Sequence, residues 1–305
     1  MTVSADTQIT ELAVNDHACL TFGEAEELLD LTAAFVRDGL DGGLKVVWLS
    51  DAAPDRAAAE LARRGIAVES ALASGQLAAA GYEGRLLTGQ VFSASDAVGW
   101  LARETMACRD QGFPGLRLAV DMGWALRPVT GVEQLPEFEE KVAAALGGTT
   151  VSVLCQYDRE RFDPVTLASV AAFHTRSVAA ATYYAGVMLR ICRQYAPPGI
   201  RLAGELDYQA SEFLALALTE AIRLDGDVTV NMAPLAFADV CCARMILDAA
   251  RGLNPKTPKT PETPETPQSP PRRMILRCRP ALAARFVLLG AADIPTLSLV
   301  SVDDG

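Results

Sequence analysis

Two side chains near the start of the sequence could contact the same ligand. His17 and Cys19 belong to the segment HACLTF, residues 17–22, which has the character of a short β-strand. Side chains alternate along a strand, so His17 and Cys19 share one of its faces. An imidazole and a thiol placed in this way could both reach one small molecule or one metal ion.

Other polar side chains stand where further predicted strands end. Asp121 ends one such strand, and Cys155 stands near the end of another. The carboxyl ends of parallel strands form the usual binding edge of an α/β sheet. We therefore predict a ligand pocket at this edge, lined by His17, Cys19, Asp121, Trp124, Cys155 and Tyr157.

The same residues allow two other interpretations. His17 could be a buried histidine with satisfied hydrogen bonds, and the cysteines could be small core residues. Alternatively, His17 and Cys19 could hold haem or a metal ion and act as a redox sensor. A histidine–cysteine pair without a CxxC motif is a weak metal pattern, so neither a cofactor nor a metal is expected.

The first predicted turn between a strand and a helix argues against nucleotide chemistry. It reads FGEAEE, residues 22–27, and lacks the phosphate-loop pattern G-x-x-x-x-G-K-[ST]. Its glutamates would repel a triphosphate from the helix N-terminus. The only histidines are His17 and His174, and no Ser/His/Asp set is suggested. We therefore predict that the chain is not an enzyme, with a degenerate RecA-like ATPase as the rival from that class.

A second candidate site begins a helix late in the chain. Asp239 is a natural N-cap, and Cys241 and Cys242 follow it in the first helical turn. The helix dipole can lower the pKa of a cysteine in this position, which would allow redox chemistry. Small residues at a helix start also permit close packing or contact with a partner, and we favour that interpretation.

The elements that would position the first site alternate between strands and long helices. Strands are predicted over 17–22, 45–50, 116–121 and 151–157, and helices over 24–39, 55–64, 95–111, 135–146 and 164–180. This alternation predicts βαβ units and a parallel sheet. We assign residues 9–184 to this first α/β domain.

The pattern changes after this domain. Residues 188–194 and 200–206 predict a β-hairpin across Pro197, Pro198 and Gly199. Further strands are predicted over 227–232, 274–278 and 297–300, and helices over 211–223, 239–250 and 281–289. Residues 185–305 thus form a second, smaller α/β domain with an antiparallel edge.

A Pro- and Thr-rich insertion at 254–273 interrupts the second domain. Its prolines recur at every third position from Pro255 to Pro270, which matches a polyproline II helix. Because it lacks apolar side chains, we predict a disordered loop. A docking or Thr-Pro phosphorylation site is the alternative.

Composition limits the partners and the compartment. The chain has 305 residues and a net charge of −11, so it would be repelled by nucleic acid and anionic membrane surfaces. It shows neither a signal peptide nor an apolar run long enough to span a membrane. Its seven cysteines are scattered and include no CxxC pair, which favours reduced thiols and a cytoplasmic location.

Three motifs of the first domain resemble the methanogen/methylotroph sensory (MEDS) domain family. They are Asp16–Phe22, Asp121–Ala125 and Leu154–Arg159. The resemblance implies a RecA/KaiC-like fold without a P-loop or nucleotide-binding residues, and the sensing of small, hydrocarbon-derived ligands. Asp121 stands where the family would have a glutamate, which leaves the charge of the site unchanged.

The second domain resembles STAS domains of the anti-sigma factor antagonist type, through Gly204–Asp207, Val228–Met232 and Leu235–Asp239. In that family a phosphorylatable serine follows the aspartate, but here Val240 follows Asp239, with Cys241 and Cys242 next. Asn231 also replaces a usual aspartate. The resemblance implies that the surface around residues 239–242 binds an anti-sigma factor or kinase-like regulatory protein. The departures predict binding without serine phosphorylation.

Together these observations predict a non-enzymatic regulatory protein that acts in signal transduction and transcription regulation. A sensory domain would bind a small molecule, and a STAS domain would bind a regulatory protein. Neither nucleic acid nor a membrane is expected as a partner. The alternatives are a haem- or metal-dependent redox sensor through His17 and Cys19 and a scaffold without a ligand.

Overall fold

The structure is a computed structural model that describes residues 7–254 and 271–302. The chain forms two compact units, Met1–Ala180 and Ala181–Gly305. The second unit begins slightly before the expected residue 185, because strand β9 (Thr182–Ala185) pairs with the strand that follows it. Most of the insertion expected at 254–273 lies outside the described residues.

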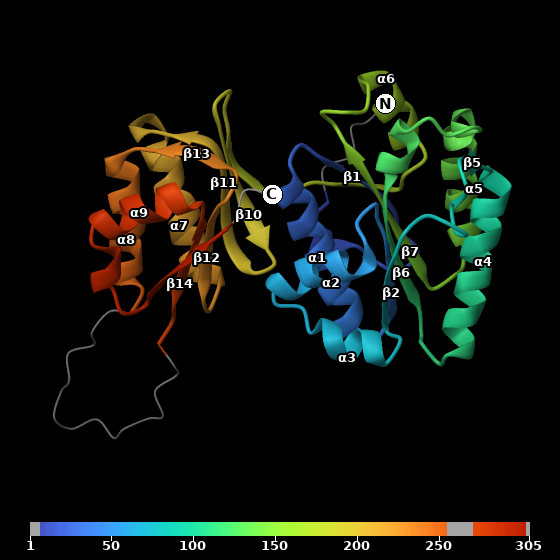
Figure 1. Ribbon diagram of the computed structural model, residues 1–305, viewed down its shortest axis with the longest axis horizontal. Helices are drawn as coiled ribbons and strands as arrows, with labels where there is room; N and C mark the ends of the chain where they lie inside the picture. The colour runs from blue at the N-terminus through green and yellow to red at the C-terminus, as the bar shows by residue number, and fades with distance from the viewer. Residues whose placement is uncertain (1–6, 255–270, 303–305) are drawn as a thin grey trace. The chain divides into compact units, whose positions relative to one another are not determined.

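A parallel sheet forms the centre of the first unit (Figure 1). Its strand order is β3-β2-β6-β7-β1-β8, and every neighbouring pair is parallel. The strands are β1 (His17–Phe22), β2 (Lys45–Leu49), β3 (Leu77–Ala80), β6 (Leu116–Asp121), β7 (Val151–Asp158) and β8 (Arg176–Val178). The continuous apolar runs in β2 and β7 follow from this architecture, since helices bury both faces of such a sheet.

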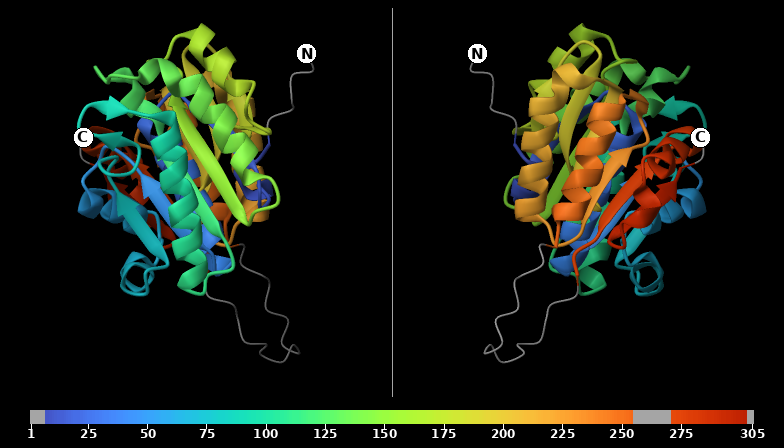
Figure 2. Two further views of the ribbon diagram at one scale, coloured as in Figure 1. Left: turned by 90° about the vertical axis from the view of Figure 1, so that its right-hand side faces the viewer. Right: turned by 90° about the vertical axis from the view of Figure 1, so that its left-hand side faces the viewer.

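Helices cover the two faces of this sheet. α1 (Ala25–Asp41), α2 (Pro54–Arg63) and α3 (Val68–Ala73) lie on one side, and α4 (Ala94–Asp110) and α5 (Leu135–Leu146) lie on the other (Figure 1). The left view of Figure 2 shows α4 and α5 in front of the strands. The short elements are η1 (Ile9–Glu11), β4 (Leu87–Thr88), β5 (Val91–Phe92), η2 (Met122–Leu126) and η3 (Val132–Gln134).

The helix expected over 164–180 is much shorter in the structure. α6 (Pro164–Ala171) begins at Asp163, whose carboxylate accepts hydrogen bonds from the amides of Val165 and Thr166. The chain then leaves the helix, and the amide of Thr175 donates to the carbonyl of His17 at 2.8 Å. Residues 176–178 continue as β8 beside β1. Pairing with an open sheet edge therefore overrides the helical pattern of this segment.

The second unit is a mixed sheet with helices on one face. Its strands are β9, β10 (Leu189–Tyr195), β11 (Pro198–Leu206), β12 (Val228–Met232), β13 (Leu235–Ala238), β14 (Met274–Cys278) and β15 (Leu297–Ser301). Its helices are α7 (Ser211–Leu224), α8 (Val240–Gly252) and α9 (Pro280–Leu288), with η4 (Tyr208–Ala210) and η5 (Ala291–Asp293). The three α-helices lie on the same side of the sheet (Figures 1 and 2). β10 and β11 form the predicted antiparallel hairpin, and β11, β12, β14 and β15 are parallel.

One strand of this unit has two different neighbours. The first half of β11 pairs with β12, and its second half pairs with β13, with a register shift between Gly204 and Glu205. β13 was not expected from the sequence. It places the chain that leads into α8 directly against the sheet.

The side chain of Asn254 and the backbone of Arg272 join the two chain ends that flank the insertion. The side-chain amide of Asn254 donates to the carbonyl of Arg272 at 2.7 Å, and its oxygen accepts the amide of Arg272 at 3.0 Å. α8 and β14 are therefore held together at this point by hydrogen bonds that do not involve the residues between them.

Among residues 7–254 and 271–302, the structure contains no helix with the length and apolar character needed to cross a membrane.

We predict that Gly204→Ala destabilises the second unit by about 2–4 kcal/mol. Gly204 has a φ of +102°, and a Cβ there would lie 2.0 Å from the carbonyl oxygen of Met188. Urea unfolding followed by far-UV circular dichroism measures the effect. Gly226→Ala is the matched control, since a Cβ at Gly226 meets no atom within 4 Å. Equal midpoints for the two variants would contradict the assigned strain.

Candidate functional site

A buried carboxylate organises the most polar part of the first unit's core. Glu139 of α5 is fully buried and points into a group of side chains from β1, β7 and the loop before β8. Its Oε2 lies 3.1 Å from Nε2 of His17 and accepts a hydrogen bond from the Cys155 thiol at 3.5 Å. Its Oε1 accepts the hydroxyl of Tyr157. We call His17, Glu139, Cys155 and His174 the core cluster.

The register of two strands explains why these side chains meet. β1 lies beside β7, with Cys19 opposite Cys155 and Thr21 opposite Tyr157. Alternation then places His17, Cys19, Cys155 and Tyr157 on the face that α5 covers. On α5 the buried positions are Leu135, Phe138, Glu139, Val142 and Leu146, the spacing of a core-facing stripe. A glutamate within such a stripe was the available sequence signal for this site, and the sequence analysis did not use it.

His174 reaches the cluster from the loop between α6 and β8. Its Nδ1 lies 2.8 Å from the carbonyl oxygen of Val170, which requires Nδ1 to carry the proton. Its Nε2 lies 3.5 Å from Oε2 of Glu139, and its ring lies 4.1 Å from the ring of His17. The sequence analysis assigned this residue to a helix and gave it no role, because it lies far from β1 in the chain.

Burial controls the charges in this region. It lowers the pKa of His174 to about 4, so this ring is neutral at neutral pH. It raises the pKa of Cys19 to about 12, with help from the charge of Glu139, and raises the pKa of Cys155 and Tyr157 well above their ordinary values. Burial would also raise the pKa of Glu139, but its hydrogen bond with His17, its electrostatic interactions with both histidines and its hydrogen bond with Tyr157 together keep the pKa below its usual value.

The structure brings together four of the six residues predicted to line a pocket: His17, Cys19, Cys155 and Tyr157. They lie inside the unit, beneath α5. The other two lie elsewhere. Asp121 caps η2, where its Oδ1 accepts the amide of Gly123 at 2.8 Å, and burial raises its pKa. Trp124 is fully buried and packs against Phe92, with ring centres 4.4 Å apart.

An open pocket of about 450 Å³ lies next to the core cluster. Phe162 lines it and packs edge-on against Tyr157, with ring centres 5.1 Å apart. Val170 also lines it and holds His174 through its carbonyl. Other apolar lining residues are Ala125, Leu126, Val132, Leu135 and Val165, while Glu133, Asp163 and Thr166 are polar.

The carboxylates in and next to the turn before α1 have ion-pair or hydrogen-bond partners within the first unit. Glu26 and Glu60 both pair with Arg64, each at 2.9 Å. Glu27 is buried, and its carboxylate accepts the amide of Gly23 at 3.1 Å. The glutamates predicted to repel a triphosphate thus have partners in the protein.

The second predicted site lies at the start of α8. Asp239 caps this helix by accepting the amide of Cys242 at 2.7 Å. The helix dipole could lower the pKa of a cysteine here, which was the less favoured interpretation, but burial and the Asp239 carboxylate raise the pKa of Cys242 to about 12. Its thiol donates to the carbonyl of Asp207 at 3.1 Å. Cys242 therefore supports the helix start, and Cys241 is exposed.

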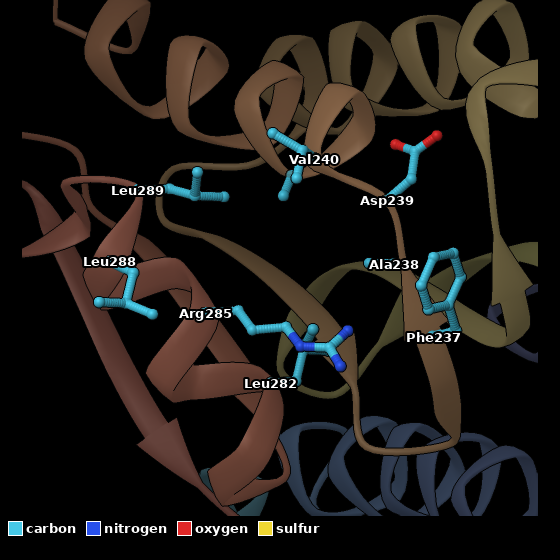
Figure 3. A pocket seen from close by; sticks show the side chains of 9 residues that line it. Phe237, Ala238, Asp239, Val240, Leu282, Arg285, Leu288 and Leu289 are labelled. Atoms are coloured by element: carbon cyan, nitrogen blue, oxygen red, sulfur yellow. The ribbon is translucent and has the colours of Figure 1, made fainter.

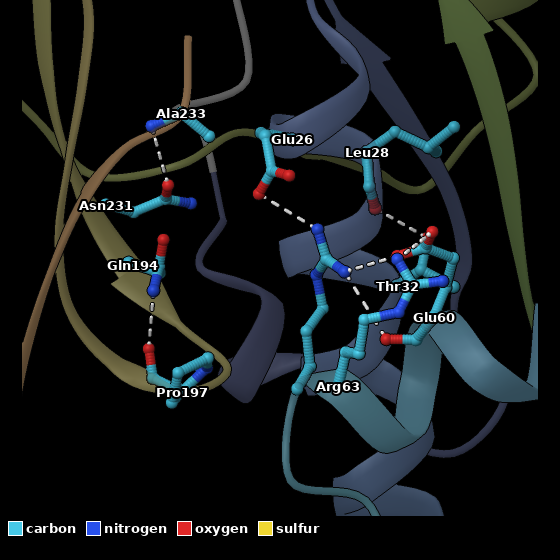
Figure 4. Close-up of polar contacts among 10 residues, drawn as sticks. Glu26, Leu28, Thr32, Glu60, Arg63, Gln194, Pro197, Asn231 and Ala233 are labelled. Carbon is cyan, nitrogen blue, oxygen red and sulfur yellow. Dashed lines mark hydrogen bonds and ion pairs between the residues drawn. The ribbon is translucent and has the colours of Figure 1, made fainter. Parts of the chain in front are cut away.

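An apolar groove of about 400 Å³ opens beside this helix start, between α8 and α9. Figure 3 shows Val240 at the start of α8 and, from α9 and its C-cap, Leu282, Arg285, Leu288 and Leu289. Val240 occupies the position at which the STAS resemblance would have a serine. Asn231, the other departure, accepts the amide of Ala233 at 3.1 Å and shapes the turn after β12 (Figure 4).

Comparisons with known proteins concern mainly the first unit. Residues 16–175 match the family model described as MEDS, the MEthanogen/methylotroph, DcmR Sensory domain. The match leaves the second unit outside, so the STAS resemblance stays a prediction. No curated protein matches the chain.

Similar solved structures include two archaeal proteins. A KaiC-like protein from Pyrococcus horikoshii OT3 has a TM-score of 0.44 and 12% identity, covering 63% of this chain and 79% of that one. The flagellar accessory protein FlaH from Methanocaldococcus jannaschii has a TM-score of 0.42 and 11% identity, covering 62% and 83%.

The prediction that the chain is not an enzyme is wrong as stated, since it rested on missing sequence motifs. The missing phosphate-loop lysine removes one way of holding a nucleotide, but it does not exclude chemistry. The likeness concerns the fold, and no activity is carried over to this chain.

We predict that iodoacetamide modifies one cysteine in the folded protein, Cys241. All seven cysteines lie in the described part of the chain, and the other six are buried. Mass spectrometry should find one adduct in the native chain, none in Cys241→Ser and seven adducts in the unfolded chain. Two or more adducts on the native protein would contradict the packing described for Cys242.

Proposed function

The chain belongs to the MEDS family, whose domain occupies residues 16–175, and on this basis we propose that it is a sensory regulatory protein that binds a small apolar molecule and a protein partner. The first unit takes the molecule into the pocket against Phe162 and Val170. The second unit binds the regulatory protein at the groove beside Val240.

The observation that carries the sensory part is the shared wall between the pocket and the core cluster. Phe162 and Val170 face the pocket and also contact or hold Tyr157 and His174. A volume of about 450 Å³ with a mostly apolar lining suits a small, hydrocarbon-derived ligand. A molecule seated there presses on the residues that surround Glu139.

This arrangement supplies a physical route for sensing. A ligand shifts a conformational equilibrium only if it binds one arrangement more tightly than the other. Here a ligand that requires a particular position of α6 also fixes Val170, and therefore the position of the His174 ring. The state of the pocket is thus coupled to the hydrogen bonds of Glu139.

We predict that Val165→Trp weakens ligand binding at least tenfold, because an indole would fill part of the pocket. Val165 is 79% exposed, so the substitution does not disturb the core. The measurement is calorimetric titration of the full chain with a panel of short-chain alcohols and halogenated alkanes. Val91→Trp is the control, since Val91 is 52% exposed and does not line this pocket. Equal affinities in both variants would place the ligand elsewhere.

The partner half of the proposal is supported by the topology and surface of the second unit. A hairpin followed by alternating helices and parallel strands fits the STAS resemblance. Val240 and Leu288 are exposed although they are apolar, and both line the groove. Arg285 adds a positive charge to it, which favours a partner with an apolar segment next to an acidic side chain.

An anti-sigma factor or kinase-like regulatory protein is the partner that this resemblance favours. Val240 has no hydroxyl group to accept a phosphate, and the groove is formed without one. The partner therefore binds the unmodified chain, and the first unit supplies the regulatory input.

We predict that Leu288→Asp abolishes binding of this partner, because it places a carboxylate in the apolar groove. Leu288 is 86% exposed, so folding should be unaffected. The tagged full-length variants are used to capture proteins from the host lysate, followed by mass spectrometry for kinase-like regulators. Leu216→Asp on α7 is the matched control, as Leu216 is 64% exposed and lies outside the groove. Capture of the same regulator by both variants, or by neither variant nor the wild type, would overturn the partner assignment.

A further inference from the structure

We propose that the core cluster is a mononuclear site for a divalent transition metal of the zinc type, with His17, Glu139, Cys155 and His174 as its ligands. Sequence analysis paired His17 only with Cys19 as a metal ligand, whereas in the structure Glu139, Cys155 and His174 supply three donors from separate elements. The inference goes beyond the sensory role proposed above, since ligand binding in the neighbouring pocket does not require a metal.

The spacing of the donor atoms fits a tetrahedral ion. Tetrahedral zinc has bonds of about 2.0–2.3 Å, which places its ligand atoms roughly 3.3–3.8 Å apart. Oε2 of Glu139 lies 3.1 Å from His17 Nε2, 3.5 Å from His174 Nε2 and 3.5 Å from Cys155 Sγ. Cys155 Sγ lies 3.6 Å from His17 Nε2, and all four atoms lie within 4.8 Å of one another. Four of the six donor–donor distances therefore lie within about 0.2 Å of the tetrahedral range.

The chemistry of the donors also selects this class of metal. Two imidazole nitrogens, one carboxylate oxygen and one sulfur form a mixed set that suits Zn²⁺ and its tetrahedral substitute Co²⁺. Mg²⁺ and Ca²⁺ prefer oxygen ligands and would gain little from three of these four groups.

One contact in the cluster is unfavourable without a cation. His174 donates through Nδ1 to Val170, so its Nε2 carries a lone pair. That nitrogen faces the Glu139 carboxylate at 3.5 Å and has no hydrogen-bond partner among the residues that the structure describes. Two acceptors thus point at each other inside the protein, where an unsatisfied polar atom is costly. A metal ion between them would use both lone pairs.

The surroundings hold the donors as metal sites require. The Val170 carbonyl fixes the tautomer and orientation of His174, and the Tyr157 hydroxyl occupies Oε1 of Glu139 so that Oε2 remains for the metal. Such outer contacts are usual around bound metals. Val170 also lines the pocket, and Tyr157 packs against Phe162 of its wall.

Metal binding changes the protonation of two ligands, Cys155 and His17. The ion displaces the proton of the Cys155 thiol, which leaves to solvent, and the thiolate binds the metal. The proton that His17 directs at Glu139 moves from Nε2 to Nδ1, and Nε2 becomes a ligand. One proton is therefore released for each ion, and no oxidant or reductant takes part.

The test is a Co²⁺ titration of the full chain, made metal-free by dialysis against a chelator and carrying Cys241→Ser to remove the exposed thiol. We expect one ion per chain, visible absorption of tetrahedral cobalt and a thiolate-to-cobalt charge-transfer band, all displaced by Zn²⁺. Binding of less than one tenth of an equivalent, or cobalt absorption without a thiolate band, would overturn the proposal.

Two matched variants identify the ligands. Cys155→Ser should lose the charge-transfer band and bind Co²⁺ at least tenfold more weakly than the parent chain. Cys19→Ser should keep the charge-transfer band and the parent affinity for Co²⁺, since Cys19 is buried beside the cluster but is not one of its four donors. Near-UV circular dichroism confirms that each variant is folded. If Cys155→Ser does not fold, His174→Ala must show the weakened binding instead. An unchanged titration in the folded variant would overturn the site.

Binding of the small molecules to the pocket beside Phe162 and Val170 is measured on the same metal-free protein. A ligand that binds while Co²⁺ does not would end the metal proposal and leave the sensory function in place.

Discussion

The burial of one carboxylate constrains the whole first unit. Moving an ionised carboxylate into a protein core costs several kcal/mol unless partners surround it. Glu139 finds them only when β1, β7, α5 and the loop before β8 are all in place. The cluster is thus a condition for the native arrangement as well as a candidate site. Well-packed apolar residues of similar volume are often at least as stabilising as a buried ionic group, so stability alone does not explain the polar residues of this cluster.

Local patterns predicted most of the fold, and topology explains what they missed. The period of apolar residues predicted β1, β2, β6 and β7 and the long helices to within a few residues. β3 (Leu77–Ala80) escaped because a run of alanines has little strand character, although it pairs with β2. β8 escaped because its residues continue a helical pattern and become a strand only beside β1. The strands that β3 and β8 pair with lie elsewhere in the chain, so the sequence of each segment alone does not reveal that it is a strand.

The candidate site shows the same limit. His17, Cys19, Cys155 and Tyr157 could be grouped because alternation in two strands needs no knowledge of the helices. Glu139 and His174 come from a covering helix and a loop, and only the folded chain brings them to those strands. At α8, the helix dipole allowed an acidic thiol as the less favoured alternative. The burial of Cys242 has the larger effect on its pKa, in the opposite direction.

The hydrogen bonds between Asn254 and Arg272 have a consequence for how this protein can change during evolution. They fix the points at which the chain leaves α8 and re-enters at β14. The cost of closing a loop rises only slowly with its length. Repeats can therefore be gained or lost between these two residues while the sheet register and the groove beside α8 are preserved. The second unit can acquire new sequence at this position without new constraints on its core.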